Sequence, residues 1–449
     1  MSSKVFYLFL VFATITTIAC DTVVDLIKAA EYPVEVHYVQ TSDGFKLRMH
    51  RIPEGLRKLN YDVATGSSEE TDSHHQNESS SREPVFLMHG LLCSATMWVC
   101  QSPDKSLGFM LADAGYDVWM LNARGTSFST AHKHLDPQSK NYWDFSWHEI
   151  GMYDVPAAIN YILQKTKHKK VHYVGHSQGC TVFAVALTMH PSLNKKISGA
   201  YLLTPAIYMH HMSSFVKTLM ENEKELVTAA NFLGIYRLEM RGSVANKLKN
   251  MICPDNDKDS NMRCSEIMYK VIGSDSGQMD RASIIYLLTK TVWDNISLKQ
   301  LIHYGQVARR GKFAMYDHGA LENQIRYGSR SPPEYNLETI TVPTTVIYGE
   351  KDGLVNTADV EHFISKLPNV RKTIKYPWNH MDFVFGQDVD VRVNDFIIRG
   401  MRDKIHNKSD SCVVKDKSEA INACTKIALK HKDDIFIQHP PIYTLVLAA

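Results

Sequence analysis

The sequence predicts an α/β fold, in which a mostly parallel central sheet carries helices on both faces. Short apolar runs that fit buried strands alternate along the chain with segments whose apolar residues recur at helical spacing. A long helix-rich interval interrupts this alternation once, after which the strands return. Because 449 residues exceed the ~250–300 residues of a single core, an insertion or a second domain is expected.

The first predicted element is a hairpin, and alternating strands and helices follow it. Its strands, 34–39 and 45–51, flank the turn signal Ser42-Asp43-Gly44. Residues 55–83 are polar and rich in serine, so they are expected to form a flexible surface loop. Buried strands are then expected at 85–88, 117–121, 171–174, 200–203, 344–348 and 372–376, and helices at 153–166, 181–189 and 389–399.

The helix-rich interval, residues 207–334, predicts a helical cap inserted between two strands of one sheet. It is rich in methionine, leucine, phenylalanine and lysine, and it contains no convincing strand. The core then consists of two parts, residues 20–206 and 335–402. Residues 403–449 form a charged extension for which the sequence predicts no role.

Residues 1–19 have the character of a signal peptide. Lys4 precedes an unbroken run of apolar and small residues that is too short to span a membrane. The small residues Thr17 and Ala19 favour cleavage near Ala19 or Cys20. A buried N-terminal helix is the alternative interpretation. We therefore expect a secreted protein with no stable transmembrane anchor.

Net charge and motifs exclude several kinds of partner. A formal charge of +2 predicts no large basic surface for nucleic acid. The chain has neither a Cys-x-x-Cys pair nor a His-Glu-x-x-His run, so we expect no metal and no cofactor. Nothing in the sequence predicts the oligomeric state.

An exported chain can form disulfides and carry glycans. Cys253 and Cys264 bracket one polar loop, and Cys412 and Cys424 bracket another. Both pairs are candidate disulfides, although spacing does not fix connectivity. The candidate glycosylation sites are the Asn-x-Ser sequons at Asn77, Asn295 and Asn407.

The central motif is Gly175-His176-Ser177-Gln178-Gly179, which directly follows a predicted strand and directly precedes a predicted helix. In this setting a serine lies on a sharp, strained turn with its hydroxyl at the top of the sheet. The small glycines allow the strand and the helix to approach each other. This context predicts that Ser177 is a nucleophile and that the chain has an α/β-hydrolase fold with a helical cap or lid.

A serine hydroxyl needs a base, and the base needs an acid to orient it. On this fold both follow the serine, the acid first. Asp352 lies at the tip of a tight turn after strand 344–348, and His380 lies in a loop after the last strand. Glu350 and Asp382 are competing acids. Asp352 is preferred because a turn tip can reach a neighbouring loop, whereas Asp382 is expected to be structural.

The tetrahedral intermediate of such a reaction needs two preorganised N–H donors for its oxyanion. One is expected to be the backbone N–H of Gln178, the residue after the nucleophile. The other is expected to be the backbone N–H of Leu91, in the loop after the first buried strand. Since both are main-chain groups, these two side chains are free to vary.

Long motifs lie at 86–92, 111–119, 172–179 and 379–383. Together they resemble the acid lipase family of gastric and lysosomal lipases. The likeness runs from about Tyr32 to Met401. It implies hydrolysis of triacylglycerols or cholesteryl esters, often at acidic pH, beneath a helical cap and lid. It also implies a cysteine pair within the cap, which fits Cys253 and Cys264, and it makes a lysosomal destination an alternative to secretion.

The chain departs from the family pattern at positions outside the predicted triad. The loop before Val85 is longer, the extension after Met401 is additional, and 121–126 reads Leu-Asn-Ala-Arg-Gly-Thr in place of Gly-Asn-Ser-Arg-Gly-Asn. Cys180 replaces a usual threonine and is expected to be a small buried residue rather than a reactive thiol. Arg124 is expected to make a structural ion pair.

The cap has two interpretations, a mobile lid that exposes apolar surface at a lipid interface and a static layer that only shapes the pocket. The first rests mainly on the resemblance. An apolar stripe fits either interpretation, because core packing produces the same pattern. The stripe consists of Met209, Met212, Phe215, Leu219 and Met220.

Together these patterns predict a secreted serine hydrolase that cleaves lipid esters at a lipid–water interface through an acyl-enzyme on Ser177. A carboxylesterase acting on soluble short-chain esters is the first alternative. A non-catalytic lipid-binding or storage relative is the second, although such chains usually lose a triad member. An epoxide hydrolase or a dehalogenase would need an aspartate at position 177. The sequence predicts neither acyl-chain length nor pH optimum.

Overall fold

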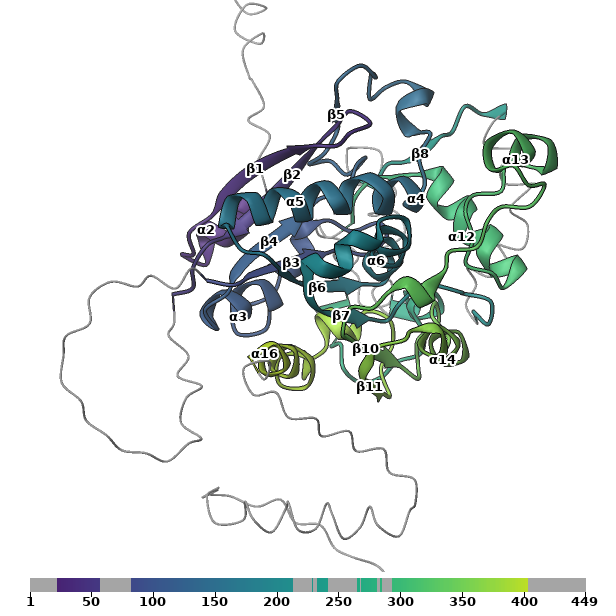
Figure 1. The fold of residues 1–449 in the computed structure, drawn as a ribbon. Coiled ribbons are helices and arrows are strands. Elements are labelled where there is room, and N and C mark those ends of the chain that lie inside the picture. The colour runs from purple at the N-terminus through teal and green to yellow at the C-terminus, as the bar shows by residue number, and fades with distance from the viewer. Residues whose placement is uncertain are drawn as a thin grey trace, which may run out of the picture. The chain divides into compact units, whose positions relative to one another are not determined.

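A nine-stranded sheet is the centre of the fold (Figure 1). The computed structural model describes residues 22–56, 82–212, 228, 232–240, 265–266, 268–280, 283–284 and 293–402. The strands lie in the order β1-β2-β4-β3-β6-β7-β10-β11, and β5 pairs with β2. Their bounds are β1 Glu35–Gln40, β2 Phe45–Ile52, β3 Pro84–Met88, β4 Asp117–Leu121, β5 Ala131–His132, β6 Val171–His176, β7 Ile197–Leu203, β10 Thr344–Gly349 and β11 Val370–Tyr376.

Most of the sheet is parallel, as predicted. Every neighbouring pair from β4 to β11 is parallel, whereas β1, β2 and β5 are antiparallel additions at one end. Parallel strands end at a common edge of a sheet, which is where ligands bind in open α/β folds. The loops after β3, β6, β10 and β11 therefore gather at one edge.

Helices cover both faces of the sheet, because the strand residues alternate between two apolar cores (Figure 1). In β3, Phe86 and Met88 belong to the apolar core that also contains residues of α5, α6 and α14, while Val85 and Leu87 belong to the core that contains residues of α2, α3 and α16. The α/β prediction is thereby confirmed. The helices around the sheet are α2 Thr22–Ala29, α3 Leu107–Asp113, α4 Trp147–Glu149, α5 Val155–Thr166, α6 Gln178–Met189, α14 Thr357–Lys366, α15 Asp382–Phe385 and α16 Asp395–Arg402.

A buried arginine ties the N-terminal hairpin to the helical layer. Arg124 is 2% exposed, and its guanidinium donates to both carboxylate oxygens of Asp43, at 2.6 and 3.0 Å. It also donates twice to Asp154 Oδ1, at 2.6 and 2.8 Å. Asp43 lies in the hairpin turn and Asp154 directly precedes α5, so one side chain links two segments far apart in sequence. The expected structural ion pair is confirmed.

The chain leaves the main sheet between β7 and β10, an interval that includes the predicted insertion, residues 207–334. Its described residues include the helices α12, Leu298–Arg310, and α13, Ala320–Tyr327. The expectation that the interval contains no strand is wrong for two short pieces. β8, Arg237–Leu238, pairs with β9, Ile296–Ser297, and Ala314 bridges Glu334. Two-residue ladders leave no alternating pattern in the sequence, so periodicity does not reveal them.

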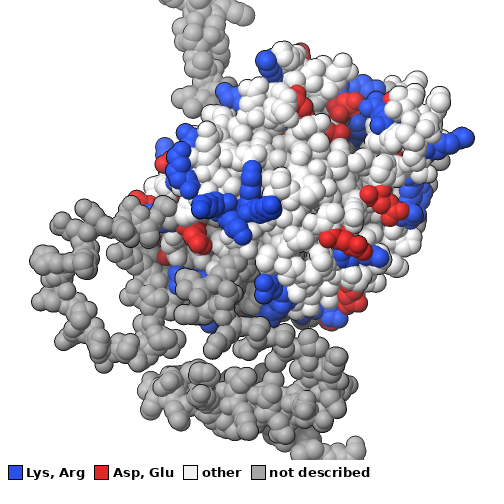
Figure 2. All heavy atoms as spheres, viewed as in Figure 1, with Lys and Arg blue, Asp and Glu red and all other residues white. Residues whose placement is uncertain are grey.

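Several predictions fall outside the described residues. They concern the signal peptide, most of the polar loop, the extension 403–449 and a part of the apolar stripe. Among the helices that the structure does describe, none combines the length and the apolar character needed to cross a bilayer. On the face in Figure 2, basic and acidic side chains are interspersed among uncharged areas rather than collected into one basic surface.

Candidate active site

Ser177 occupies a strained turn between β6 and α6. Its φ is +54°, a conformation that residues with a side chain rarely adopt. The flanking glycines make the turn possible, because a Cβ on Gly175 would lie 2.8 Å from the carbonyl carbon of Gly179. A Cβ on Gly179 would lie 2.3 Å from the carbonyl oxygen of Met88. Strand β6, helix α6 and the end of β3 therefore meet too closely for any side chain at these positions.

Ser177, His380 and Asp352 form one continuous line of hydrogen bonds. Ser177 Oγ lies 2.9 Å from His380 Nε2, and His380 Nδ1 lies 2.7 Å from Asp352 Oδ2. A carboxylate accepts hydrogen bonds, so Nδ1 carries the proton and Nε2 is left to accept from the serine. All three side chains are buried. The structure thus brings together the three residues that the sequence nominated.

The acid loop holds the Asp352 carboxylate in a fixed orientation. Its other oxygen, Oδ1, accepts the N–H groups of Leu354 and Val355, each at 2.8 Å. The competing acids lie elsewhere: Glu350 is exposed and 3.4 Å from Lys375 Nζ. Asp382 is fully buried and accepts the N–H of Asn379 at 2.6 Å, and burial raises the pKa of this carboxyl to about 6. Of the three candidate acids, Asp352 is the one hydrogen-bonded to His380.

His176, inside the serine motif, holds the backbone of His380, a role that the sequence analysis missed. Its Nε2 lies 3.0 Å from the His380 carbonyl oxygen, and an oxygen acceptor requires Nε2 to be the donor. Burial, and then the proximity of His380, lower the pKa of His176 to about 3. The side chain therefore stays neutral at ordinary pH and keeps one proton for this bond. Its only signal in the sequence is its place before the serine.

The loop after β3 lies directly against the serine turn. A Cβ on Gly90 would be 3.0 Å from His176 Nδ1 and 3.2 Å from Ser177 Cβ. Leu91 and Leu92 follow and line the same cavity as Ser177. Leu92 has φ +61°, and its carbonyl accepts the N–H of Asp294 at 2.6 Å. Asp294, which lies within the predicted insertion, thus holds the loop that carries one of the predicted oxyanion donors.

The second predicted donor, the backbone N–H of Gln178, belongs to the first residue of α6. The first four N–H groups of a helix have no partner within the helix, so this position suits an anionic oxygen. The Gln178 side chain points to the insertion, where its Nε2 donates to Gln300 Oε1 of α12 at 2.9 Å. The turn around Ser177 is therefore held on one side by its close packing against the end of β3 and on the other by this hydrogen bond to α12.

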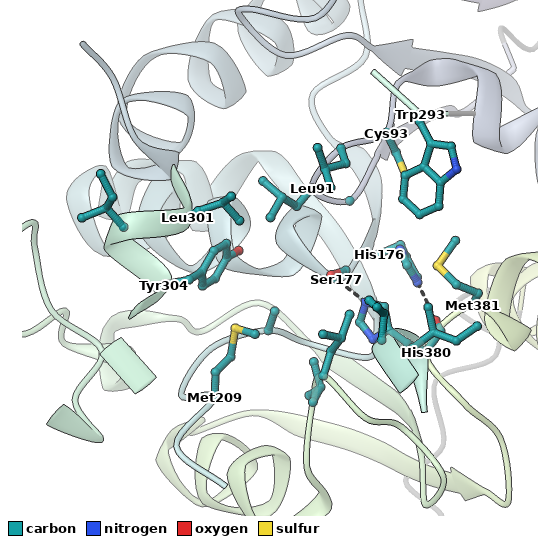
Figure 3. A pocket seen from close by; sticks show the side chains of 18 of the residues that line it. Leu91, Cys93, His176, Ser177, Met209, Trp293, Leu301, Tyr304, His380 and Met381 are labelled. Atoms are coloured by element: carbon teal, nitrogen blue, oxygen red, sulfur yellow. Dashed lines mark hydrogen bonds between the residues drawn. The ribbon is translucent and has the colours of Figure 1, made fainter. Parts of the chain in front are cut away.

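An apolar cavity of about 340 Å³ opens onto Ser177 (Figure 3). Met209, Leu301 and Tyr304 lie on one side of the serine, and Cys93, Trp293 and Met381 lie on the other. Besides Ser177, the described lining has few polar side chains, namely His176, His380 and Tyr304, whose hydroxyl lies 2.8 Å from Thr181 Oγ1. Such a cavity suits a substrate that is largely hydrocarbon around one reactive carbonyl.

The other predicted site residues have mixed outcomes. Cys180 is fully buried, its thiol donates to the Gly175 carbonyl at 3.2 Å, and burial raises its pKa well above the ordinary value, so the small buried role holds. Asn295 is half-buried, with its Oδ1 accepting the N–H of Met240, and the sequon hydroxyl of Ser297 is fully buried. The remaining candidate sites lie outside the described residues: Cys253, Cys264, Cys412, Cys424, Asn77 and Asn407.

Comparison with known proteins gives two family matches. Residues 83–387 match the family described as the alpha/beta hydrolase fold, and residues 23–102 match a partial alpha/beta-hydrolase lipase region. Lipase 3 of Drosophila melanogaster is 38% identical over 382 residues, which cover 83% of this chain and 90% of that protein. Gastric triacylglycerol lipase of Homo sapiens is 34% identical, with 83% and 89% covered.

Two solved structures show the same fold at low sequence identity. A putative lipase from Sulfolobus solfataricus has a TM-score of 0.50 and 13% identity, covering 83% of this chain and 94% of that one. A soluble variant of monoglyceride lipase from Saccharomyces cerevisiae, in complex with a substrate analog, has a TM-score of 0.50 and 15% identity, covering 84% and 97%. At such identities the likeness concerns the fold alone.

Proposed function

The chain belongs to the lipase family of the α/β-hydrolase fold and is a carboxylic ester hydrolase, and we propose that it cleaves lipid esters through an acyl-enzyme on Ser177. The observation that carries this proposal is the hydrogen-bonded line Ser177–His380–Asp352, which ends in an apolar cavity. Triacylglycerols and cholesteryl esters are the substrates we propose.

In the first half of the reaction Ser177 Oγ attacks the ester carbonyl carbon while its proton passes to His380 Nε2. The Asp352 carboxylate, 2.7 Å from Nδ1, stabilises the imidazolium that forms. The former carbonyl oxygen becomes an oxyanion, for which we assign the N–H groups of Leu91 and Gln178 as donors. The intermediate collapses, and the alcohol leaves with the proton from His380.

In the second half water hydrolyses the acyl-enzyme. His380 Nε2 takes a proton from the water, whose oxygen attacks the acyl carbon. The second tetrahedral intermediate then releases the carboxylic acid, and the proton on Nε2 returns to Ser177 Oγ. His176 does not exchange protons in these steps. Its bond to the His380 carbonyl, at 3.0 Å, fixes the backbone of the base.

The cavity supports a lipid substrate rather than a polar one. Its walls are leucine, isoleucine, valine, methionine and tryptophan side chains on both sides of the serine. Burying an acyl chain there is favourable by about 0.8 kcal/mol for each CH₂ group. Long acyl chains are therefore expected to bind better than acetate or butyrate, which distinguishes a lipase from an esterase of soluble substrates.

We also propose that the protein is exported and that residues 207–334 form a cap over the core. Export is supported by the apolar run after Lys4 and the small residues near Ala19. The cap is supported by α12, which contributes Leu298, Leu301, Ile302 and Tyr304 to the cavity.

The test compares the wild type with Ser177→Ala on emulsified triacylglycerol, cholesteryl ester and dissolved butyrate ester between pH 4 and 8. The protein is collected from the medium of a eukaryotic host, where the mature chain is expected to begin at Cys20 or Asp21. Ser177→Ala is expected to lose all three activities, and the exposed-site control Ser365→Ala is expected to keep them. Turnover by Ser177→Ala would refute the mechanism, and preference for the dissolved ester would support a carboxylesterase instead.

A further inference from the structure

One stretch of the insertion, Tyr269–Ser274, lies against the loop that carries Asp352. Gly273 pairs with Asp352 in an isolated antiparallel bridge. The Ser274 N–H donates to the Lys351 carbonyl at 3.1 Å, and the Gly353 N–H donates to the Ile272 carbonyl at 3.1 Å. The insertion is thus hydrogen-bonded, backbone to backbone, on both sides of the proposed catalytic acid.

The same stretch also holds the loop of the proposed base. The Ile272 carbonyl, which accepts from Gly353, also accepts the N–H of His380 at 3.1 Å. One oxygen atom therefore joins the acid loop to the base loop. On its other side, the His380 carbonyl accepts from His176 Nε2 at 3.0 Å. The backbone of His380 is fixed at its N–H by the insertion and at its carbonyl by the serine turn.

This contact depends on the absence of side chains at two facing positions. Gly273 has φ +116°, and a Cβ there would lie 1.9 Å from the Lys351 carbonyl oxygen and 2.6 Å from the Gly353 nitrogen. A Cβ on Gly353 would in turn lie 2.8 Å from the Cα and the nitrogen of Gly273. Only glycine combines this backbone conformation with so close an approach.

We propose that residues 272–274 of the insertion are a positioning element for the acid–base pair, and that Gly273 is the residue on which their close approach depends. The inference rests on the proposed function, because it assigns the stretch a purpose only if Asp352 and His380 act together. A methyl group at 273 would push Lys351 and Asp352 away from His380. Gly273 itself does not line the cavity, although Val271 and Ile272 beside it do, so a displacement at 273 is expected to act mainly on the alignment of the acid and the base.

The experiment compares Gly273→Ala with Gly277→Ala. Gly277 lies four residues further along the chain and also has positive φ, +77°, but no atom of the described residues lies within 4 Å of its added Cβ. On a dissolved butyrate ester we expect kcat of Gly273→Ala to fall roughly 10- to 100-fold, as an ångström-scale misplacement does, with KM within about two-fold. Gly277→Ala is expected to keep both constants.

A phosphonate ester that labels Ser177 separates misplacement from unfolding. In Gly273→Ala the labelling rate is expected to fall together with kcat, while the final extent of labelling stays complete. A wild-type kcat in Gly273→Ala overturns the inference. A fall in kcat that equals the fall in the fraction of molecules labelled at Ser177 also overturns it, because it shows unfolding rather than misplacement.

Two further variants keep the experiment decisive. If Gly273→Ala does not fold, Ser274→Pro takes its place, because it keeps Gly273, removes the N–H that donates to the Lys351 carbonyl and places the proline ring against that oxygen. The same fall in kcat is expected, and a wild-type kcat overturns the inference. Ser177→Ala is measured in parallel. Activity in that variant refutes the proposed function itself, whereas an inactive Ser177→Ala beside a normal Gly273→Ala refutes the positioning element alone.

Discussion

Replacing Arg124 with methionine is expected to destabilise the fold strongly without altering the active site. Methionine roughly fills the volume but removes four charge-assisted hydrogen bonds, at 2.6–3.0 Å, to Asp43 and Asp154. Asp43 keeps access to water, since its side chain is 27% exposed. The Asp154 side chain is completely buried and is left without its counter-ion. Removing one partner of a buried pair costs about 3–5 kcal/mol of unfolding free energy.

Urea unfolding, followed by tryptophan fluorescence, measures this loss. With an m-value of about 3 kcal/mol/M, a loss of about 4 kcal/mol lowers the midpoint by roughly 1.3 M. Asp154→Asn in the Arg124→Met background removes the unpaired charge, so it is expected to recover part of the loss. A shift below about 0.3 M in Arg124→Met, or no recovery in the double variant, would contradict this account of the cluster.

The pH dependence of the loss follows from Asp154. Burial raises the pKa of this carboxyl and Arg124 lowers it, so without Arg124 the pKa rises further. A carboxyl whose pKa is higher in the folded than in the unfolded state destabilises the fold above the unfolded pKa, because it must then be ionised while buried. The deficit of Arg124→Met relative to wild type is therefore expected to be smaller at pH 5 than at pH 8. An equal deficit at both pH values would refute the reasoning.

Two further predictions concern the site itself. Asp352→Asn is expected to lower kcat on the dissolved ester by about 10⁴-fold, because the amide stabilises the wrong tautomer of His380. The exposed control Glu350→Gln is expected to keep kcat within about two-fold of wild type. Comparable losses of kcat in both variants would argue against Asp352 as the acid. Iodoacetamide at pH 8 is expected to leave the folded enzyme active, because burial raises the pKa of Cys93 to about 12 and that of Cys180 well above its ordinary value. Rapid inactivation, with alkylation of either cysteine found by mass spectrometry, would show that these thiols are accessible and reactive.

The sheet and its serine turn could be predicted because local sequence determines them. The buried strands are short apolar runs, and β4 occupies the very residues expected, Asp117–Leu121. Ser177 could be nominated from the strand, the glycines and the helix around it. Asp352 and His380 could be nominated because the chain order of acid and base is a property of the fold. The structure places these three side chains in one hydrogen-bonded line, and their catalytic role stays a prediction.

The contacts that align this line could not be predicted, for a physical reason. The Ile272 carbonyl and the Asp294 N–H are main-chain groups. Every residue carries the carbonyl and every residue but proline carries the N–H, so no residue type marks them. Gly273 is one of 23 glycines in the chain, and its positive φ is visible only in the structure. His176 differs because its side chain, rather than its main chain, makes the contact. Its partner, however, is the backbone carbonyl of a residue 204 positions away, which no sequence pattern indicates.

The bridge between Gly273 and Asp352 bears on how enzymes of this shape can be recombined. An insertion connected to its core only through the two strands that flank it could be replaced by the insertion of a relative in order to change the substrate preference. Here the insertion and the acid loop are in close backbone contact at Gly273 and Gly353. A Cβ on either glycine would collide with the backbone of the other. A chimera must therefore take both contacting segments, residues 272–274 and the acid loop, from the same parent protein. The part of the chain needed for catalysis thus includes a part of the insertion.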